Sequence, residues 1–188
     1  MTNDQLKTLI AANWSIVICA GFYLAWWLIT FRPPEPRGSI AGRICLVIAA
    51  LSGLAGFAIA TKILSDHDDI GAVGSGLSGW VILAGGVISY FVLLAISAVA
   101  FRRQVTSELL IIVGWGTLEL SIINALYRGG RMPQLTALTL SAVMIIAIVA
   151  DLICYMLYYN ISYEKGYVIG CIPLVLAMII TSLICILG

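Results

Sequence analysis

The chain contains six long apolar stretches, and this pattern restricts it to few folds. They run at 8–31, 39–64, 77–101, 105–127, 135–159 and 167–187. Each reaches the roughly 20 residues that a helix needs to cross the hydrocarbon core of a bilayer. Backbone polar groups in that core must be hydrogen-bonded within the protein, so the stretches predict six transmembrane helices. Because the connections are short, we expect an all-α integral membrane protein with consecutive helices packed in one polytopic domain over 1–188.

Composition supports the membrane class and narrows the partners. Hydrophobic residues make up 62% of the chain and charged residues 10%, against about 25% charged residues in soluble domains. The net charge of +1 argues against nucleic acid as a partner. The first apolar stretch is too long for a signal-peptide core, so we expect it to be retained as a spanning helix.

The basic residues give a prediction of orientation. Six of the ten lysines and arginines lie in or beside the first, third and fifth loops, and four lie on the other side. Since basic residues concentrate on the cytoplasmic side, this favours both termini outside. We expect an integral protein of a prokaryotic cell membrane.

Three acids interrupt the apolar stretches. Glu108 and Glu119 lie in 105–127, and Asp151 lies in 135–159. An acid near the middle of a membrane helix costs about 3 kcal/mol on insertion scales, so such residues are usually functional. Glu108 and Glu119 are 11 residues apart, close to three helical turns, and therefore share a face with Trp115 between them.

These acids predict a binding site in the membrane. The helices over 105–127 and 135–159 are expected to be neighbours, which would place the three acids at successive depths. Carboxyl groups that lie close together in a low dielectric tend to hold their protons. We expect Trp115, Tyr155 and Asn124 to complete a pocket that binds or transports a small solute, a proton or a cation.

Each acid also has a structural interpretation. Glu108 lies in the first turn of its helix, where the helix dipole favours an acid. Asp151 alternatively hydrogen-bonds a neighbouring hydroxyl or pairs with a base. Glu119 is deepest in its helix and has no evident basic partner, so it is the leading functional candidate.

One aromatic pattern and one pattern of small residues each allow two interpretations. Tyr23, Trp26 and Trp27 form either an interfacial belt or a stacking wall for a ligand. Ala49, Gly53, Gly56 and Ala60 fall on one stripe, which serves either packing within the bundle or dimerisation. Ser39 is expected to cap the second helix, and Pro173 to kink the sixth.

Metal, cofactor and catalytic patterns are weak. The five cysteines lie in apolar runs without a CxxC pair, which is typical of buried, reduced residues: Cys19, Cys45, Cys154, Cys171 and Cys185. The segment Asp66–Asp69 with His67 has poor spacing for a cation site, so we predict no metal and no cofactor. Neither HExxH nor GxSxG occurs, which makes an enzyme the least supported class.

Six spans in fewer than 200 residues resemble, in size and span count, the substrate-binding subunits of energy-coupling-factor vitamin transporters. The Ala-x-x-x-Ala contact pattern of their first helix is absent from TLIAANWSIVICAGFYLAWW. The sequence thus favours a protein that handles a small solute or cation. The alternative is an accessory or scaffold subunit that binds a partner membrane protein or forms a homodimer.

Overall fold

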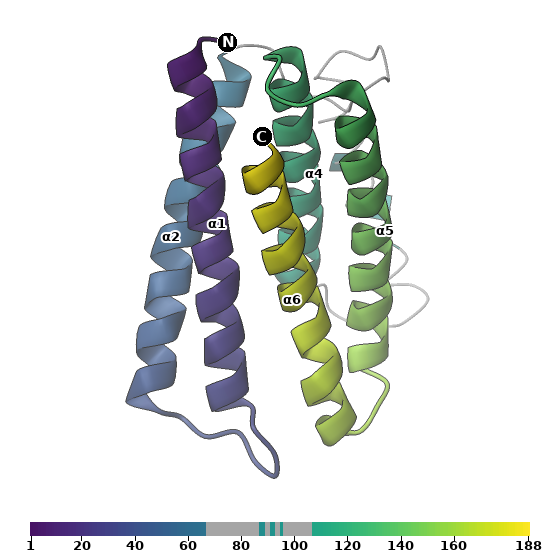
Figure 1. Cartoon of the computed structure of the whole chain (residues 1–188). Coiled ribbons are helices and arrows are strands. Elements are labelled where there is room, and N and C mark those ends of the chain that lie inside the picture. The colour runs from purple at the N-terminus through teal and green to yellow at the C-terminus, as the bar shows by residue number, and fades with distance from the viewer. Residues whose placement is uncertain (67–86, 89–90, 93–94, 96–106) are drawn as a thin grey trace.

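The computed structural model describes residues 1–66, 87–88, 91–92, 95 and 107–188 (Figure 1). This part of the chain forms five long helices and no strand, which confirms the predicted all-α class there. All five helices are long and apolar enough to cross a membrane. Their bounds are α1 Asn3–Thr30, α2 Ile40–Ser65, α4 Ser107–Arg128, α5 Gln134–Tyr158 and α6 Tyr163–Leu187.

The predicted third span at 77–101 lies almost wholly outside the described residues, as does most of the acidic loop with His67. A spanning helix between α2 and α4, the sixth helix of the bundle, therefore stays a prediction. In Figure 1, α2 and α4 run in the same direction, which a further span between them requires.

The other helices match the predicted spans, with small errors at polar ends. α1 begins at Asn3 rather than at residue 8 because Thr2 and Gln5 form a capping box that satisfies free backbone N–H groups. Ser39 caps α2 as predicted, since its hydroxyl accepts a hydrogen bond from the Gly42 N–H at 2.9 Å. An apolar stretch marks the buried part of a helix, whereas a cap extends the helix into polar residues.

The described helices form a bundle (Figure 1). α1 packs along α2 on one side and α6 on the other, and α5 packs against both α4 and α6. The predicted neighbours α4 and α5 are thus in contact. Both termini lie at the same end of the bundle, which we call the terminal end.

The small-residue stripe of α2 packs inside the bundle against α1. A Cβ atom built at Gly53 would lie 2.7 Å from the Cys19 sulfur, and one at Gly56 would lie 2.7 Å from the Ala12 carbonyl oxygen. At Gly56 the neighbour is backbone, so a side chain there would push the helices apart; at Gly53 the neighbour is the Cys19 thiol, which would have to turn away or bond to the new side chain. The stripe therefore allows the close approach of two helices of the same chain.

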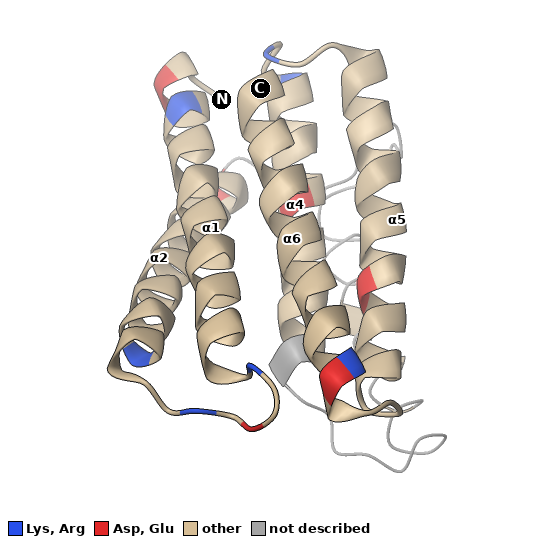
Figure 2. Cartoon of the chain, turned by 60° about the horizontal axis from the view of Figure 1, so that its bottom comes forward, with Lys and Arg blue, Asp and Glu red and all other residues tan. Residues whose placement is uncertain are grey.

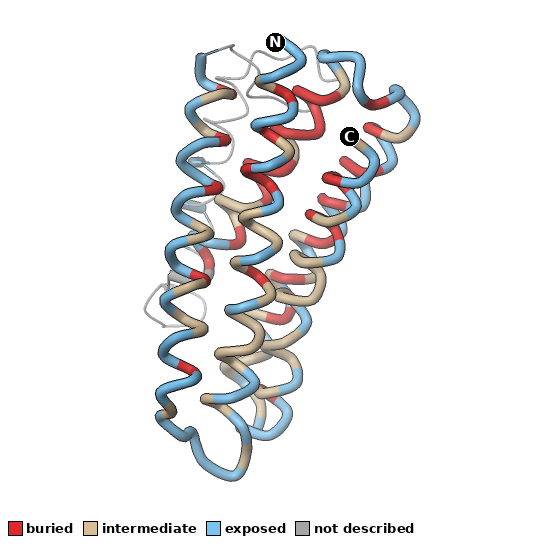
Figure 3. Tube along the Cα trace, turned by 60° about the vertical axis from the view of Figure 1, so that its left-hand side comes forward, coloured by how far each residue is buried: buried red, intermediate tan, exposed pale blue. Residues whose placement is uncertain are grey.

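The best-packed core lies toward the terminal end, as the buried residues in Figure 3 show. It joins the start of α1, the end of α2, the end of α4, the start of α5 and the end of α6. Its fully buried members include Leu9, Leu64, Ile122, Leu126 and Ile184. We call this part of the bundle the aliphatic half.

The outer surface of the bundle is apolar. Large hydrophobic side chains are exposed along α1, α2, α5 and α6 and near the start of α4, among them Val47 on α2 and Ile146 on α5. Lysine and arginine lie near the helix ends and in the connections (Figure 2). This distribution is suited to contact with lipid, because the apolar surface would have no polar cover in water.

Candidate functional site

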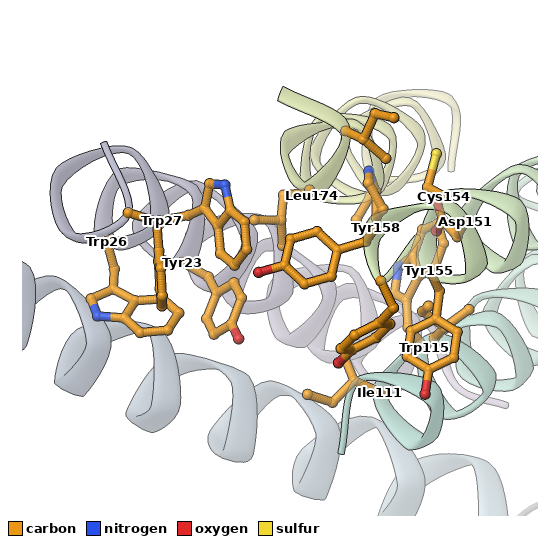
Figure 4. A pocket seen from close by; sticks show the side chains of 17 residues that line it. Tyr23, Trp26, Trp27, Ile111, Trp115, Asp151, Cys154, Tyr155, Tyr158 and Leu174 are labelled. Atoms are coloured by element: carbon orange, nitrogen blue, oxygen red, sulfur yellow. The ribbon is translucent and has the colours of Figure 1, made fainter. Parts of the chain in front are cut away.

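A cavity of about 330 Å³ lies in the half of the bundle away from the terminal end (Figure 4). Its walls come from the end of α1, the start of α4, the end of α5 and the first half of α6. α6 supplies small and aliphatic residues, and the other three segments supply aromatic rings. The aromatic residues of the lining are Tyr23, Trp26, Trp27, Phe31, Trp115, Tyr155, Tyr158 and Tyr159.

The aromatic rings pack on one another around the cavity. Tyr23 and Trp26, one turn apart on α1, have ring centroids 4.9 Å apart. Trp27 of α1 meets Tyr158 of α5 with centroids 5.7 Å apart in an edge-on arrangement, and Figure 4 shows the two side chains next to each other. The α1 aromatic cluster therefore forms a cavity wall that reaches across to α5.

Hydrogen bonds from α6 hold the end of α1 in place. The Trp27 indole N–H donates to the Tyr167 carbonyl at 3.0 Å, and the Tyr167 hydroxyl donates to the Leu28 carbonyl at 3.2 Å. The Tyr163 hydroxyl donates to the Phe31 carbonyl at 2.8 Å. The two hydroxyl groups satisfy carbonyls at a helix end that lack an intrahelical donor. The aromatic wall is thus fixed to α6.

Among the described residues, Asp151 is the one carboxylic acid in the cavity lining, and no lysine, arginine or histidine lies there. The residue is only 1% exposed. Its Oδ1 atom is buried and has no hydrogen-bond partner in the described part of the chain. It lies about 8 Å from the midpoint of α5, at 1.5 Å per residue. Asp151 therefore brings to a mainly aromatic and aliphatic wall an acceptor that has no partner among the described residues.

Glu119 has different surroundings, although it is also fully buried at 0% exposure. Its Oε1 atom accepts a hydrogen bond from the Thr181 hydroxyl at 2.8 Å, and its Oε2 atom accepts one from the Asn13 amide at 3.0 Å. The Trp115 indole N–H donates to the Thr181 oxygen at 3.1 Å. A chain of hydrogen bonds therefore runs from the cavity wall at Trp115 through Thr181 to Glu119.

The structure gathers some of the predicted site residues and separates others. Trp115, Asp151 and Tyr155 all line the cavity. Glu119 lies behind the wall, and Asn124 is buried on α4 but does not line this cavity. Glu108 lies in the first turn of α4, and its side chain is outside the described part of the structure. Whether the three acids lie close together at successive depths thus stays a prediction.

Asn13 and Thr181 are partners of Glu119 that the sequence analysis did not identify. Both are polar residues within apolar helices, which was the available signal. Their pairing with Glu119 spans 106 and 62 residues of sequence. It depends on how α1 and α6 meet α4, and no local spacing encodes that.

Fold and cavity together define an all-helical bundle suited to a membrane, with an aromatic cavity that contains one buried carboxyl group. Among the described residues, no three histidine, cysteine, aspartate or glutamate side chains are grouped so that they could hold a metal ion. Comparison of the chain with protein-family models, with curated proteins and with solved structures gave no match. The proposals below therefore rest on the geometry of the site.

Proposed function

We propose that this protein binds a small solute in the aromatic cavity, within the membrane, and that Asp151 recognises the polar or charged part of that solute. The observation that carries the proposal is that Asp151, which lines the cavity, has a buried Oδ1 atom without a hydrogen-bond partner among the described residues. A buried polar group without a partner costs about 1–3 kcal/mol, so nearly all such groups are hydrogen-bonded. A ligand that pairs with Asp151 would remove this cost.

The size and lining of the cavity support the same function. Its volume of about 330 Å³ falls in the range of roughly 300–1,000 Å³ that is usual for small-molecule sites. Such sites are mostly apolar with a few polar groups that fix orientation. Here the rings supply the apolar surface, and Asp151 supplies the orienting group.

Glu119 has a positioning role in this proposal. Both of its carboxyl oxygens already accept hydrogen bonds, from Asn13 and Thr181. Thr181 in turn accepts the hydrogen bond from Trp115, whose ring lines the cavity. Glu119 therefore holds the Trp115 ring in one orientation through Thr181, and it acts on the solute only through that ring.

Native mass spectrometry of the detergent-purified protein tests the proposal. We expect the wild type to carry a discrete small molecule and Asp151→Asn to lose it. Ser141→Ala is the matched control, because Ser141 is another buried residue of α5 with an unpaired oxygen but does not line the cavity. It should keep the bound molecule.

Two results would contradict solute binding at Asp151. One is a bare protein mass in all three samples. The other is a bound molecule that Asp151→Asn retains as well as the wild type does. Purification in a stable complex with a larger membrane protein, without a bound solute, would instead support the accessory role.

A further inference from the structure

We infer that the solute is an organic cation, an ammonium group whose nitrogen carries apolar substituents. This inference rests on the proposed function and names its ligand class. It follows from the charge of the cavity lining, from the chemistry of its walls and from the position of the unpaired carboxyl oxygen.

The charge of the lining favours a cation. In the described part of the lining, Asp151 is the one carboxylic acid, and no lysine, arginine or histidine side chain accompanies it. An anionic solute would meet no opposite charge there and would approach a buried carboxyl group at a cost. A cation would pair with the buried Oδ1 atom that has no other partner in the described structure.

The aromatic walls favour the same charge. The face of a tryptophan or tyrosine ring attracts a cation that lies within about 6 Å of the ring centre. Trp26 and Trp27 bring such rings from α1, and Tyr155 and Tyr158 bring them from the same helix as Asp151. A ligand in this cavity therefore has rings of two helices around it and a carboxyl group at one wall.

Apolar substituents distinguish this ligand from a metal ion. Calcium and magnesium require six or more oxygen ligands, several of them often water. The cavity offers mainly carbon surface, together with one carboxyl group. An ammonium ion with alkyl or aryl groups has a weakly hydrated charge and an apolar body, and both parts match this lining.

Pro173 adds a further acceptor to the wall. Proline has no N–H, so the Ile169 carbonyl one turn earlier lacks its usual helical donor. Both Ile169 and Pro173 line the cavity. The Ile169 carbonyl, like the Asp151 carboxyl group, accepts hydrogen bonds and attracts positive charge.

Benzyltrimethylammonium and its uncharged carbon analogue neopentylbenzene test the inference. The two molecules have the same shape, and the cation has no N–H, so a difference in affinity reports on charge. We would titrate each into the full-length protein in detergent and measure binding by calorimetry. We expect the wild type to bind the cation at least about tenfold more tightly than the analogue, because a buried carboxyl group and several rings face it.

Three variants locate the binding. Asp151→Asn should weaken binding of the cation by at least about tenfold, since it removes the opposite charge while keeping the shape. Trp26→Leu should weaken it by about 2- to 30-fold, which is the usual range for one cation–π contact. Trp14→Leu should leave the affinity unchanged, because Trp14 is 40% exposed on the same helix and does not line the cavity.

The outcomes separate this inference from the proposed function. Equal affinities of the wild type for the cation and the analogue would overturn the inference, and this comparison needs no variant. An unchanged cation affinity in Asp151→Asn would also overturn it. If neither probe binds but native mass spectrometry shows a solute that depends on Asp151, the ligand class is wrong and the proposed function stands. If no solute is found there either, both fail.

Discussion

Asp151 and Glu119 are both buried carboxylic acids on helices suited to span a membrane, yet their oxygen atoms meet different surroundings. Both oxygens of Glu119 accept hydrogen bonds from other helices. One oxygen of Asp151 faces no described partner, and aromatic rings surround the cavity beside it. The same chemical group therefore joins three helices at one position and leaves an acceptor without a described partner at the other.

At this scale, Glu119→Gln should fold almost as well as the wild type. The new amide oxygen keeps the hydrogen bond from Thr181. The new NH₂ group donates to Asn13 Oδ1, which is buried and unpaired, once the Asn13 amide turns over. Glu119→Leu leaves Thr181 and Asn13 without this partner and should lower the free energy of unfolding by about 1–3 kcal/mol. Denaturant unfolding in detergent micelles measures both values.

Ser121→Ala is the control for that comparison. The Ser121 hydroxyl is buried on the same helix, but it donates to the Thr117 carbonyl of α4 itself. Its loss should therefore have a small effect on the stability of the bundle. The assigned positioning role of Glu119 is wrong if Glu119→Leu is as stable as Ser121→Ala.

At the scale of the helices, the close contact between α1 and α2 can be tested by disulfide cross-linking. A Cβ atom built at Gly53 lies 3.5 Å from the Cys19 Cβ atom, at the short end of the distances found in disulfides. We therefore expect Gly53→Cys to form a disulfide with Cys19 when a mild oxidant is added. Counting maleimide-reactive thiols before and after oxidation should show the loss of two per chain.

Two controls make the cross-link specific. Ser52→Cys places the thiol about 100° further round α2 and should not react with Cys19. Gly53→Cys combined with Cys19→Ala should keep all its thiols. If Ser52→Cys loses two thiols as readily as Gly53→Cys does, the small-residue stripe does not face α1 as described.

The sequence predicts well where the helices lie along the chain, but it predicts poorly which of their faces pack together. Hydrophobic length identifies the five described helices, because a spanning helix satisfies its own backbone hydrogen bonds whatever its neighbours are. Helical spacing also places Tyr155 and Tyr158 on the face of Asp151, and all three line the cavity. The partners of Glu119 are not predictable in this way, since Asn13 and Thr181 lie on helices far away in the sequence.

The aromatic cluster of α1 shows a second limit. Tyr23, Trp26 and Trp27 near a helix end fit both an interfacial belt and a ligand wall, because both uses place rings at that depth. Only the packing of α1 against α5 and α6 decides which surface the rings cover. That packing includes the Trp27 contact with Tyr158 and its hydrogen bond to Tyr167.

The molecule as a whole presents an apolar exterior, and this predicts how it tolerates charge. Ile146 lies at the midpoint of α5 and is 68% exposed. Ile146→Arg should cost about 3 kcal/mol of membrane insertion, because the charge would enter the bilayer centre. Leu135→Arg, 78% exposed in the first turn of α5, should insert normally, because its charge can reach the interface.

The amount of each variant in the alkali-washed membrane fraction measures insertion. We expect Ile146→Arg to be depleted from that fraction and Leu135→Arg to match the wild type. Equal recovery of the two variants would contradict a transmembrane placement of α5, since an exposed isoleucine in water accepts a charge without loss.

The aliphatic half also bears on whether a bound solute ever crosses the membrane. Leu9, Ile122, Leu126 and Ile184 are fully buried between the cavity and the terminal end. Their alkyl groups offer a charged molecule neither hydration nor a counter-ion. They therefore form a barrier to a charged solute between the cavity and the terminal end. A receptor needs only the entrance beside the aromatic rings, whereas a carrier needs a second exit. If the proposed solute is carried across the membrane, those four side chains have to separate.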